Sequence, residues 1–202
     1  MSIYGLKPRF QALLRPLTGA LFRLGVTANQ VTLAACIVSV ALGALLTAMP
    51  ERPALFLFVP VWFFVRMAFN AIDGMLAREF GQASALGAYL NELSDVVSDA
   101  ALYVPFALLP GSNPWLVSAV IVLAVISEMA GILGVTVGGG RRYDGPMGKS
   151  DRAFLFGLIG LLAGLGVPLG GALGWIWAGA AALLVVTIVN RVRRGLAQSV
   201  RP

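Results

Sequence analysis

The sequence contains no histidine and a single cysteine among its 202 residues. These two absences exclude a disulfide framework, a zinc cluster built from cysteine and histidine, and any nucleophile or general base that depends on an imidazole. Charged residues are also scarce, at 12% of the chain. Chemistry in this protein must therefore use carboxylates, amides and basic groups. Oxygen ligands of that kind suit hard cations such as Mg²⁺ or Mn²⁺.

Apolar residues, in contrast, are abundant. They make up 58% of the chain, and the mean hydropathy is +0.86. A soluble domain of this size has too little interior for so much apolar sequence, so the composition predicts an all-α integral membrane protein. Six apolar stretches each approach the ~20 residues that a transmembrane helix needs. They lie at residues 31–49, 53–72, 87–109, 114–138, 152–170 and 172–189.

The basic residues gather on one side of these six predicted spans. They precede the first span, lie between the second and third and between the fourth and fifth, and follow the sixth, whereas only Arg52 falls on the opposite side. Because cytoplasmic loops carry the excess of lysine and arginine, both termini are predicted to be cytoplasmic. The sequence therefore predicts a multi-pass protein of the cytoplasmic (inner) membrane.

Three segments are expected along the chain. Residues 1–25 alternate apolar and basic positions, interrupted by Pro8 and Pro16, and are typical of an amphipathic segment on the cytoplasmic leaflet. A floppy tail is the alternative interpretation. A six-helix transmembrane domain is predicted at residues 26–190, and a basic cytoplasmic tail at residues 191–202.

Acidic side chains concentrate between residues 70 and 99. The five are Asp73, Glu79, Glu92, Asp95 and Asp99. An ionisable group at membrane depth is costly unless it is paired or bound to a metal, so it is a functional candidate. On a helix that begins near residue 87, Asn91, Asp95 and Asp99 share one stripe, and Glu92 joins the two aspartates on another. Acids this close repel unless cations lie between them, which predicts a site for one or two divalent ions.

Small residues and an arginine accompany these acids. Gly74, Ala77 and Gly87 would let a flat or phosphorylated ligand approach the backbone closely. Arg78 supplies a donor suited to phosphate. Metal ligands beside arginine and glycine indicate phosphate chemistry at the membrane surface.

At these residues the chain resembles the CDP-alcohol phosphotransferase family, whose signature is D-x-x-D-G-x-x-A-R-x8-G-x-x-x-D-x-x-x-D. The corresponding residues are Asn70, Asp73, Gly74, Ala77, Arg78, Gly87, Asn91 and Asp95. Two of the signature aspartates are thus asparagine here. T-A-N-Q-V-T at 27–32 and G-P-M-G-K-S-D-R-A at 145–153 resemble two further elements of the family, so the resemblance extends over the whole chain.

The resemblance implies an enzyme of phospholipid biosynthesis that moves a phosphatidyl group from a CDP-linked lipid, such as CDP-diacylglycerol, to an acceptor hydroxyl and releases CMP. It implies Asp95 as the general base and the four motif positions Asn70, Asp73, Asn91 and Asp95 as ligands of Mg²⁺ or Mn²⁺. It assigns the CDP moiety to Asn29, Gly74, Ala77, Arg78 and Gly87, and the acceptor to Arg141, Lys149 and Arg152. It also implies a homodimer, and no nucleic acid is expected as a partner.

The two asparagines raise a question of charge. They leave the motif with two carboxylates against as many as four positive charges from two ions, and the affinity of such sites depends on ligand charge. Glu92 and Asp99 share a stripe with Asp95, and counting them restores the lost charge. We therefore hypothesise that Glu92 and Asp99 join Asp73 and Asp95 as metal ligands, with Asn70 and Asn91 as neutral ones.

Several alternatives stay open. A catalytically silent relative that binds a CDP-lipid or a metal as a scaffold or sensor is the main one, whereas a transporter is disfavoured because the last two spans contain no acidic residue. Glu128, within the fourth span, is either a site residue or a structural partner of Arg66 or Arg78.

The acceptor is open among glycerol phosphate, inositol phosphate, serine, choline and a second lipid, because a family sets the reaction class and not the substrate.

Overall fold

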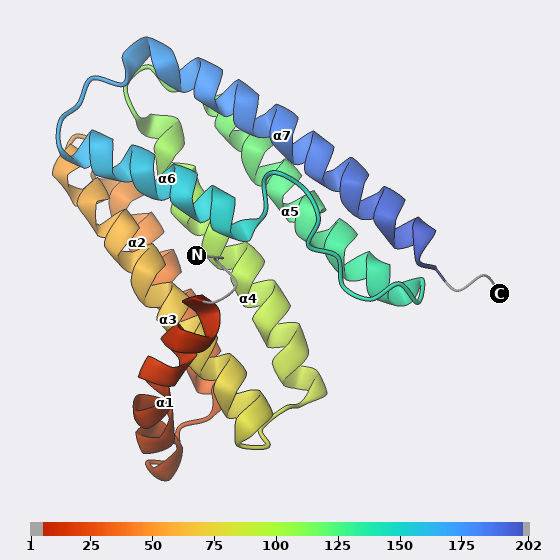
Figure 1. The fold of residues 1–202 in the computed structure, drawn as a ribbon. Coiled ribbons are helices and arrows are strands. Elements are labelled where there is room, and N and C mark those ends of the chain that lie inside the picture. The colour runs from red at the N-terminus through yellow and green to blue at the C-terminus, as the bar shows by residue number, and fades with distance from the viewer. Residues whose placement is uncertain (1–5, 200–202) are drawn as a thin grey trace. The chain divides into compact units, whose positions relative to one another are not determined.

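The structure, a computed structural model, describes residues 6–199 and the side chains of residues 8–199. All the regular elements in this range are helices, which confirms the all-α prediction (Figure 1). In chain order they are α1 (Leu6–Arg23), α2 (Ala28–Ala48), η2 (Pro53–Leu57), α3 (Phe58–Glu79), α4 (Ala85–Tyr103), η3 (Val104–Leu108), α5 (Pro114–Thr136), α6 (Lys149–Gly164) and α7 (Gly170–Ala197).

Four helical stretches are long and apolar enough to cross a membrane, so this is a multi-pass membrane protein. They are Ala28–Ala48, Pro53–Glu79, Pro114–Thr136 and Gly170–Ala197. The other two predicted spans coincide with α4 and α6. However, α4 carries three acids, and α6 has only 16 residues. Six spans therefore stay a prediction, although a helix occupies each of the six predicted positions.

Side-chain caps explain where two of these helices begin. At the start of α2, the amide of Thr27 donates to Gln30 Oε1 at 2.9 Å, and the amide of Gln30 donates to Thr27 Oγ1 at 3.3 Å. This reciprocal pair is a capping box. Asn113 caps α5 by accepting from the amides of the two residues that follow Pro114. Proline suits this first helical position because its missing N–H has no helical partner there.

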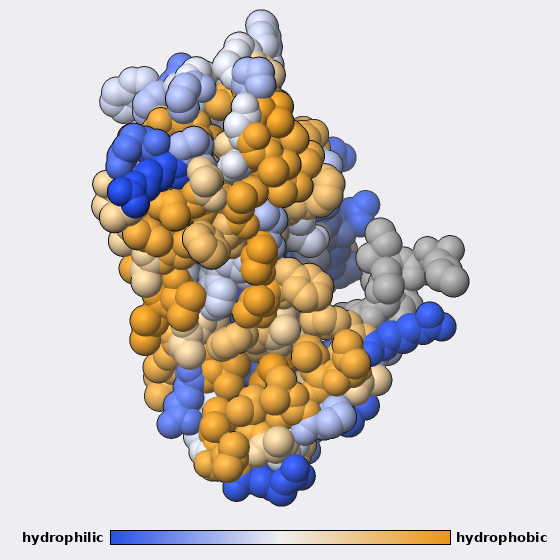
Figure 2. Space-filling model, turned by 90° about the vertical axis from the view of Figure 1, so that its left-hand side faces the viewer, coloured by the Kyte–Doolittle hydropathy of each residue, from blue (hydrophilic) through white to orange (hydrophobic). Residues whose placement is uncertain are grey.

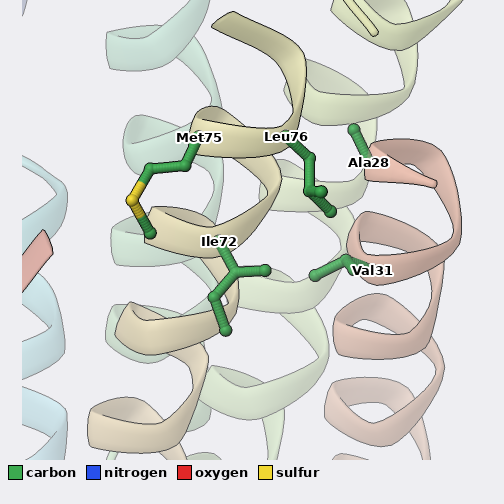
Figure 3. Close-up of a cluster of buried hydrophobic side chains, with 5 residues drawn as sticks. All are labelled: Ala28, Val31, Ile72, Met75 and Leu76. Carbon is green, nitrogen blue, oxygen red and sulfur yellow. The ribbon is translucent and has the colours of Figure 1, made fainter. Parts of the chain in front are cut away.

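The N-terminal segment is helical from Leu6 to Arg23, and residues 1–5 lie outside the described residues. Helix α1 continues through Pro16, although proline disfavours a helix interior. Leu14 and Leu21 of α1 pack against a buried cluster of Ala28, Val31, Ile72, Met75 and Leu76, drawn in Figure 3. The tertiary contacts of this apolar face offset the backbone hydrogen bond that the proline removes.

The described chain divides into two compact units. Unit 1 combines the chain up to Leu42 with Val61–Ser98, and unit 2 combines Gly43–Pro60 with the chain from Asp99 onward. The cluster in Figure 3 forms the core of unit 1.

Aromatic rings form the core of unit 2. The Phe156 ring stacks on Tyr103 at a centroid distance of 3.8 Å and on Trp177 at 5.0 Å. Phe106 meets Phe156 edge to face at 5.0 Å. The buried indole N–H of Trp177 donates to Ser112 Oγ at 2.8 Å, so the polar end of this large side chain is satisfied.

Apolar side chains cover most of the face shown in Figure 2. Over the described residues, the large apolar side chains that are exposed include Phe64, Phe154, Trp115 and Trp175, each more than 60% exposed. A soluble monomer rarely exposes so much apolar surface, whereas lipid would cover it. The two exposed tryptophans suit the interface between membrane and water.

Candidate active site

The motif residues of unit 1 lie on α3 and α4, and the turn between these helices is tied to the start of α2. Gln82, in that turn, accepts a hydrogen bond from the amide of Ala28 at 2.7 Å and donates to the carbonyl of Val26 at 3.5 Å. Gly81 has a φ of 69°, which favours glycine. The turn thereby brings the first residues of α2 beside the first residues of α4.

Two of the expected CDP-binding residues meet at this junction. A Cβ added to Gly87 would lie 2.9 Å from Asn29 Oδ1 and 3.0 Å from Ser84 Oγ. The amide of Gly87 also donates to Ser84 Oγ at 3.0 Å. Gly87 is therefore a position where a side chain would collide with its neighbours, and the collision would displace Asn29.

A second pair lies on α3 itself. The Arg78 guanidinium folds back over Gly74, so that its Nη2 atom lies 2.7 Å from the place a Cβ would take. Arg78 is exposed, in keeping with the contact to a diphosphate expected from the sequence. Ala77, between them, packs against the core cluster of unit 1.

Asp73 is buried, and Thr32 fixes its carboxylate. The Thr32 hydroxyl donates to Asp73 Oδ2 at 2.8 Å, and Asp73 is only 7% exposed. Asn70 lies one turn earlier on α3 and is half-buried. The T-A-N-Q-V-T segment thus contributes Asn29 beside Gly87 and Thr32 beside Asp73, which gives this resemblance a structural meaning.

Asp95 is paired with Arg66, which the sequence analysis did not assign to the site. Arg66 Nη2 donates to Asp95 Oδ1 and to the backbone carbonyl of Asp95, both at 3.1 Å. The Arg66 side chain is 5% exposed and that of Asp95 is 22% exposed. The available signal was an arginine inside an apolar run, which a membrane tolerates only when it is paired.

The carboxylates do not gather into a multi-acid metal site. Among residues 6–199, no three Asp, Glu, Cys or His side chains lie close enough together to hold a metal ion. The half-buried amides of Asn70 and Asn91 are the remaining oxygen donors of the motif. An ion held by two carboxylates with help from these amides therefore stays a prediction, as does the role of Glu92.

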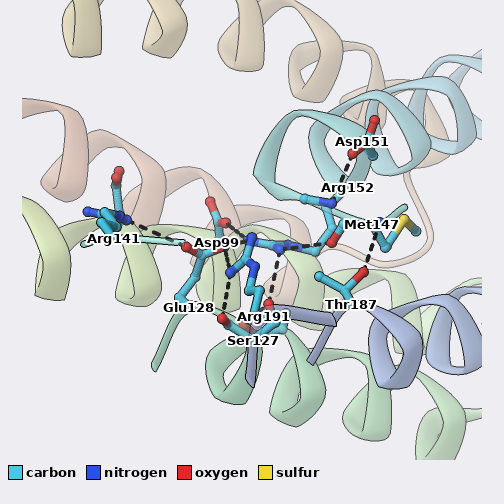
Figure 4. Close-up of polar contacts among 12 residues, drawn as sticks. Asp99, Ser127, Glu128, Arg141, Met147, Asp151, Arg152, Thr187 and Arg191 are labelled. Carbon is cyan, nitrogen blue, oxygen red and sulfur yellow. Dashed lines mark hydrogen bonds and ion pairs between the residues drawn. The ribbon is translucent and has the colours of Figure 1, made fainter. Parts of the chain in front are cut away.

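Asp99, Arg141 and Arg152, three of the remaining metal and acceptor candidates, belong to a largely buried ionic network in unit 2, shown in Figure 4. Arg152 Nη2 lies 3.2 Å from Asp99 Oδ2 and 3.0 Å from Glu128 Oε1. Its Nη1 donates to Ser127 Oγ at 3.4 Å and to the carbonyl of Met147 at 3.5 Å. Asp99 therefore neutralises Arg152 here, and its predicted role as a metal ligand stays untested.

Glu128 pairs with arginines other than those weighed in the sequence analysis. Besides Arg152, it lies 3.5 Å from Arg191 Nη1 and 3.6 Å from Arg141 Nη2. Glu128 thus pairs with arginines as one interpretation expected, but with Arg152, Arg191 and Arg141 instead of Arg66 or Arg78, and its role as a site residue stays a prediction. Residue spacing along one helix does not reveal a pairing that depends on how α5 and α7 are rotated against each other.

Arg141, Lys149 and Arg191 were also named in the predictions from the sequence. Arg141 lies over the Tyr143 ring, with its guanidinium carbon 5.2 Å from the ring centroid. Lys149 is the first residue of α6 and is half-buried. Arg191, expected to begin the basic tail, lies inside α7 and is 2% exposed.

An all-helical membrane protein with this motif on two adjacent helices is a phosphotransferase of nucleotide-linked alcohols. A family model of CDP-alcohol phosphatidyltransferases matches residues 25–189. The chain belongs to that family, and it is a membrane transferase that moves a phosphoryl-alcohol group from a CDP-linked donor to a hydroxyl, with release of CMP.

Two curated proteins illustrate the range of its relatives. The chain is 47% identical over 199 residues to inner membrane protein YnbA of Escherichia coli K12, covering 98% of each chain. It is 29% identical over 205 residues to phosphatidylinositol phosphate synthase of Corynebacterium glutamicum, covering 95% of this chain and 87% of the relative.

Solved structures show the same fold. Phosphatidylinositol phosphate synthase of Mycobacterium tuberculosis with CDP-DAG bound superposes with a TM-score of 0.74 at 22% identity, covering 89% of this chain and 92% of that one. The same synthase in complex with manganese and citrate gives a TM-score of 0.72 at 22% identity, with 90% and 88% covered.

Proposed function

We propose that this protein transfers the phosphatidyl group of CDP-diacylglycerol to an acceptor alcohol in phospholipid biosynthesis. The observation that carries the proposal is the motif on α3 and α4, where Gly87 meets Asn29 and Gly74 lies under Arg78. The CDP-DAG complex of the mycobacterial synthase, which shares this fold, supports the choice of donor.

The donor is assigned to unit 1. The cytidine lies against Gly74, Ala77 and Gly87, with Asn29 at its edge, because the two glycines leave room for a flat ring near the backbone. Arg78 is exposed and contacts the diphosphate, since a guanidinium matches phosphate oxygens in a bidentate manner.

The site is proposed to use one divalent ion, Mg²⁺ or Mn²⁺, held by Asp73 and Asp95 with Asn70 and Asn91. The manganese complex of the mycobacterial synthase supports the kind of ion. The number follows from charge: two carboxylates supply two negative charges, and the Arg66 guanidinium already offsets part of the charge on Asp95. When bound, the ion would neutralise the diphosphate and polarise its phosphoryl oxygens.

Asp95 is proposed to accept the proton of the acceptor hydroxyl, and Arg66 fixes the orientation of that carboxylate. The hydroxyl oxygen then forms a bond to the phosphorus that carries the diacylglycerol. The bond from this phosphorus to the bridging oxygen breaks, and CMP leaves with the electron pair. Arg141, Lys149 and Arg152 are proposed to contribute to the acceptor site.

The protein is proposed to reside in the inner membrane with both termini in the cytoplasm. The printed name of the E. coli relative and the one-sided basic residues support this placement. A homodimer is proposed from the family resemblance. On α7, Gly170 and Gly174 have open space beside them and follow the small-x-x-x-small spacing that favours helix association. Native mass spectrometry in nanodiscs would test the dimer.

Release of CMP is the direct test of the function. Purified protein in nanodiscs with CDP-diacylglycerol and Mg²⁺ or Mn²⁺ is expected to release CMP with at least one acceptor alcohol. Asp95→Asn is expected to abolish this release, whereas Glu51→Gln, which changes an exposed acid outside the motif, is expected to keep it. Thermal protection by CDP-diacylglycerol without CMP release for any acceptor would instead identify a silent binder.

A further inference from the structure

We infer that the acceptor alcohol carries no phosphate group, because internal carboxylates already occupy the arginines that would bind one. The inference rests on the proposed function and concerns its acceptor site. The residues involved are Asp99, Glu128, Arg141, Arg152 and Arg191, all in unit 2 (Figure 4).

Glu128 lies at the centre of this arrangement. Its carboxylate is within 3.0–3.6 Å of guanidinium nitrogens from Arg152, Arg191 and Arg141. Three converging guanidinium groups form the type of site that binds a phosphate, because each can donate to a tetrahedral anion. Here the glutamate carboxylate takes that central position.

The two innermost arginines are inaccessible to a soluble anion. The Arg152 side chain is 1% exposed and that of Arg191 is 2% exposed. Asp99 adds a second carboxylate to Arg152. An acceptor phosphate would have to displace Glu128 and leave its carboxylate desolvated without a partner, which is strongly unfavourable.

The neighbouring arginines of the loop between α5 and α6 and of α7 are engaged as well. Asp144 Oδ2 lies 2.7 Å from Arg142 Nη2, and Asp144 Oδ1 lies 2.6 Å from Arg194 Nη1. Each of the five arginines of unit 2 named here thus has a carboxylate within 3.6 Å, although five arginines share three carboxylates. An added anion would compete with these internal carboxylates, whereas an uncharged polyol would not.

Glu128 is therefore a specificity-determining residue. Glu128→Ala removes both the carboxylate and its volume, so Arg141 and Arg191 lose this partner and Arg152 keeps Asp99. This change is expected to strengthen the binding of inorganic phosphate at least tenfold and to let phosphorylated acceptors compete. Glu128→Asp, which keeps the charge, is expected to retain the discrimination against phosphate.

The test compares acceptors and anion binding in parallel. Wild-type protein with CDP-diacylglycerol is expected to release CMP faster with glycerol or inositol than with glycerol 3-phosphate or inositol phosphate. Faster CMP release with glycerol 3-phosphate than with glycerol, or with inositol phosphate than with inositol, would overturn the inference. Glu51→Gln, which removes an exposed acid outside this network, is the charge-matched control and is expected to keep the wild-type preference.

Calorimetric titration of inorganic phosphate decides the inference even without turnover. If no acceptor yields CMP, the proposed function is wrong. The inference that Glu128 blocks a phosphate site still stands if Glu128→Ala alone gains phosphate binding. Phosphate binding by Glu128→Ala that is no tighter than that of the wild type would refute it, whichever way the activity assay turns out.

Discussion

Arg66 on α3 holds Asp95 on α4 through both the side chain and the backbone of the aspartate, each at 3.1 Å. Arg66 lies in a predicted span and is buried, so its charge needs this partner. The pair joins the proposed general base to the preceding helix of unit 1. It also places a permanent positive charge beside a residue proposed to bind a metal.

The first prediction concerns this pair. Arg66→Met is expected to destabilise the protein by about 3 kcal/mol, because it removes the arginine that pairs with the largely buried Asp95 carboxylate. CMP release is expected to fall at least tenfold, since Asp95 loses its orientation. Arg66→Lys keeps the charge, so its stability and its CMP release are expected to lie between those of the wild type and those of Arg66→Met. Thermal unfolding in nanodiscs and the CMP assay measure both effects, and Arg52→Met, outside unit 1, is the control. Wild-type activity in a folded Arg66→Met protein would contradict the positioning role.

The second prediction concerns the number of metal ions. Wild-type protein is expected to bind one Mn²⁺ per chain, counted by the loss of the free-ion signal in electron paramagnetic resonance. Asn70→Asp combined with Asn91→Asp adds two negative charges at nearly unchanged shape, so this double variant is expected to bind a second ion. Two ions on the wild type would show that Arg66 and the asparagines do not limit the site.

Features that depend on residues close together in the sequence were predicted well, and contacts between distant helices were not. The span expected at 114–138 became α5, Pro114–Thr136, because the apolar run and its N-terminal cap are local signals. Asn29 and Gly87 were both assigned to the CDP moiety from motifs that encode a family geometry, and the structure places them side by side. These features need no knowledge of how the helices face one another.

The ion pairs were not predictable in this way. Arg66 with Asp95, and Glu128 with Arg191, join residues far apart in sequence on different helices. Their pairing depends on helix rotation, which hydropathy does not specify. The continuous helix through Pro16 reflects a related effect, because tertiary packing of α1 outweighs a local helix-breaking preference.

The third prediction separates the two acids hypothesised to replace the lost charge. Glu92→Gln is expected to weaken Mn²⁺ binding, because Glu92 lies one turn from Asp95 on α4. Asp99→Asn is expected to act mainly on stability, since Asp99 neutralises the buried Arg152. Calorimetric titration with Mn²⁺ measures the first effect and thermal unfolding the second. Wild-type metal binding in both variants would refute the hypothesis that these acids supply charge to the metal site.

The fourth prediction concerns the nucleotide pocket. Gly87→Ala would place a Cβ 2.9 Å from Asn29 Oδ1, so it is expected to displace Asn29 and to weaken CDP binding about tenfold, or ~1.4 kcal/mol. Stability should change little, because the Asn29 side chain can move. Gly171→Ala, with no atom within 4 Å of the added Cβ, is the control. Titration of CDP against both variants measures the difference, and equal affinities would place the cytidine elsewhere.

The fifth prediction concerns Asp144, in the loop before α6. Burial raises the pKa of the Asp144 carboxyl, but hydrogen bonds from Arg142 and Arg194 outweigh it and hold this pKa below its usual range. The interactions of ionised Asp144 with Arg142 and Arg194 therefore stabilise the folded protein at pH values above the unfolded-state pKa of about 3.9. This stabilisation disappears as the pH falls through the lower folded-state pKa.

Asp144→Asn is accordingly expected to lower stability at pH 7 by about 1 kcal/mol, a modest loss because Arg194 is largely exposed. Hydrogen exchange of the loop amides should accelerate in this variant at neutral pH. The difference from wild type should begin to shrink as the pH falls below ~4 and should vanish once the pH passes the lowered folded-state pKa of the Asp144 carboxyl. Glu51→Gln, an exposed acid in another loop, should show no such dependence. A difference that persists unchanged at low pH would mean that the charge of Asp144 does not hold this loop.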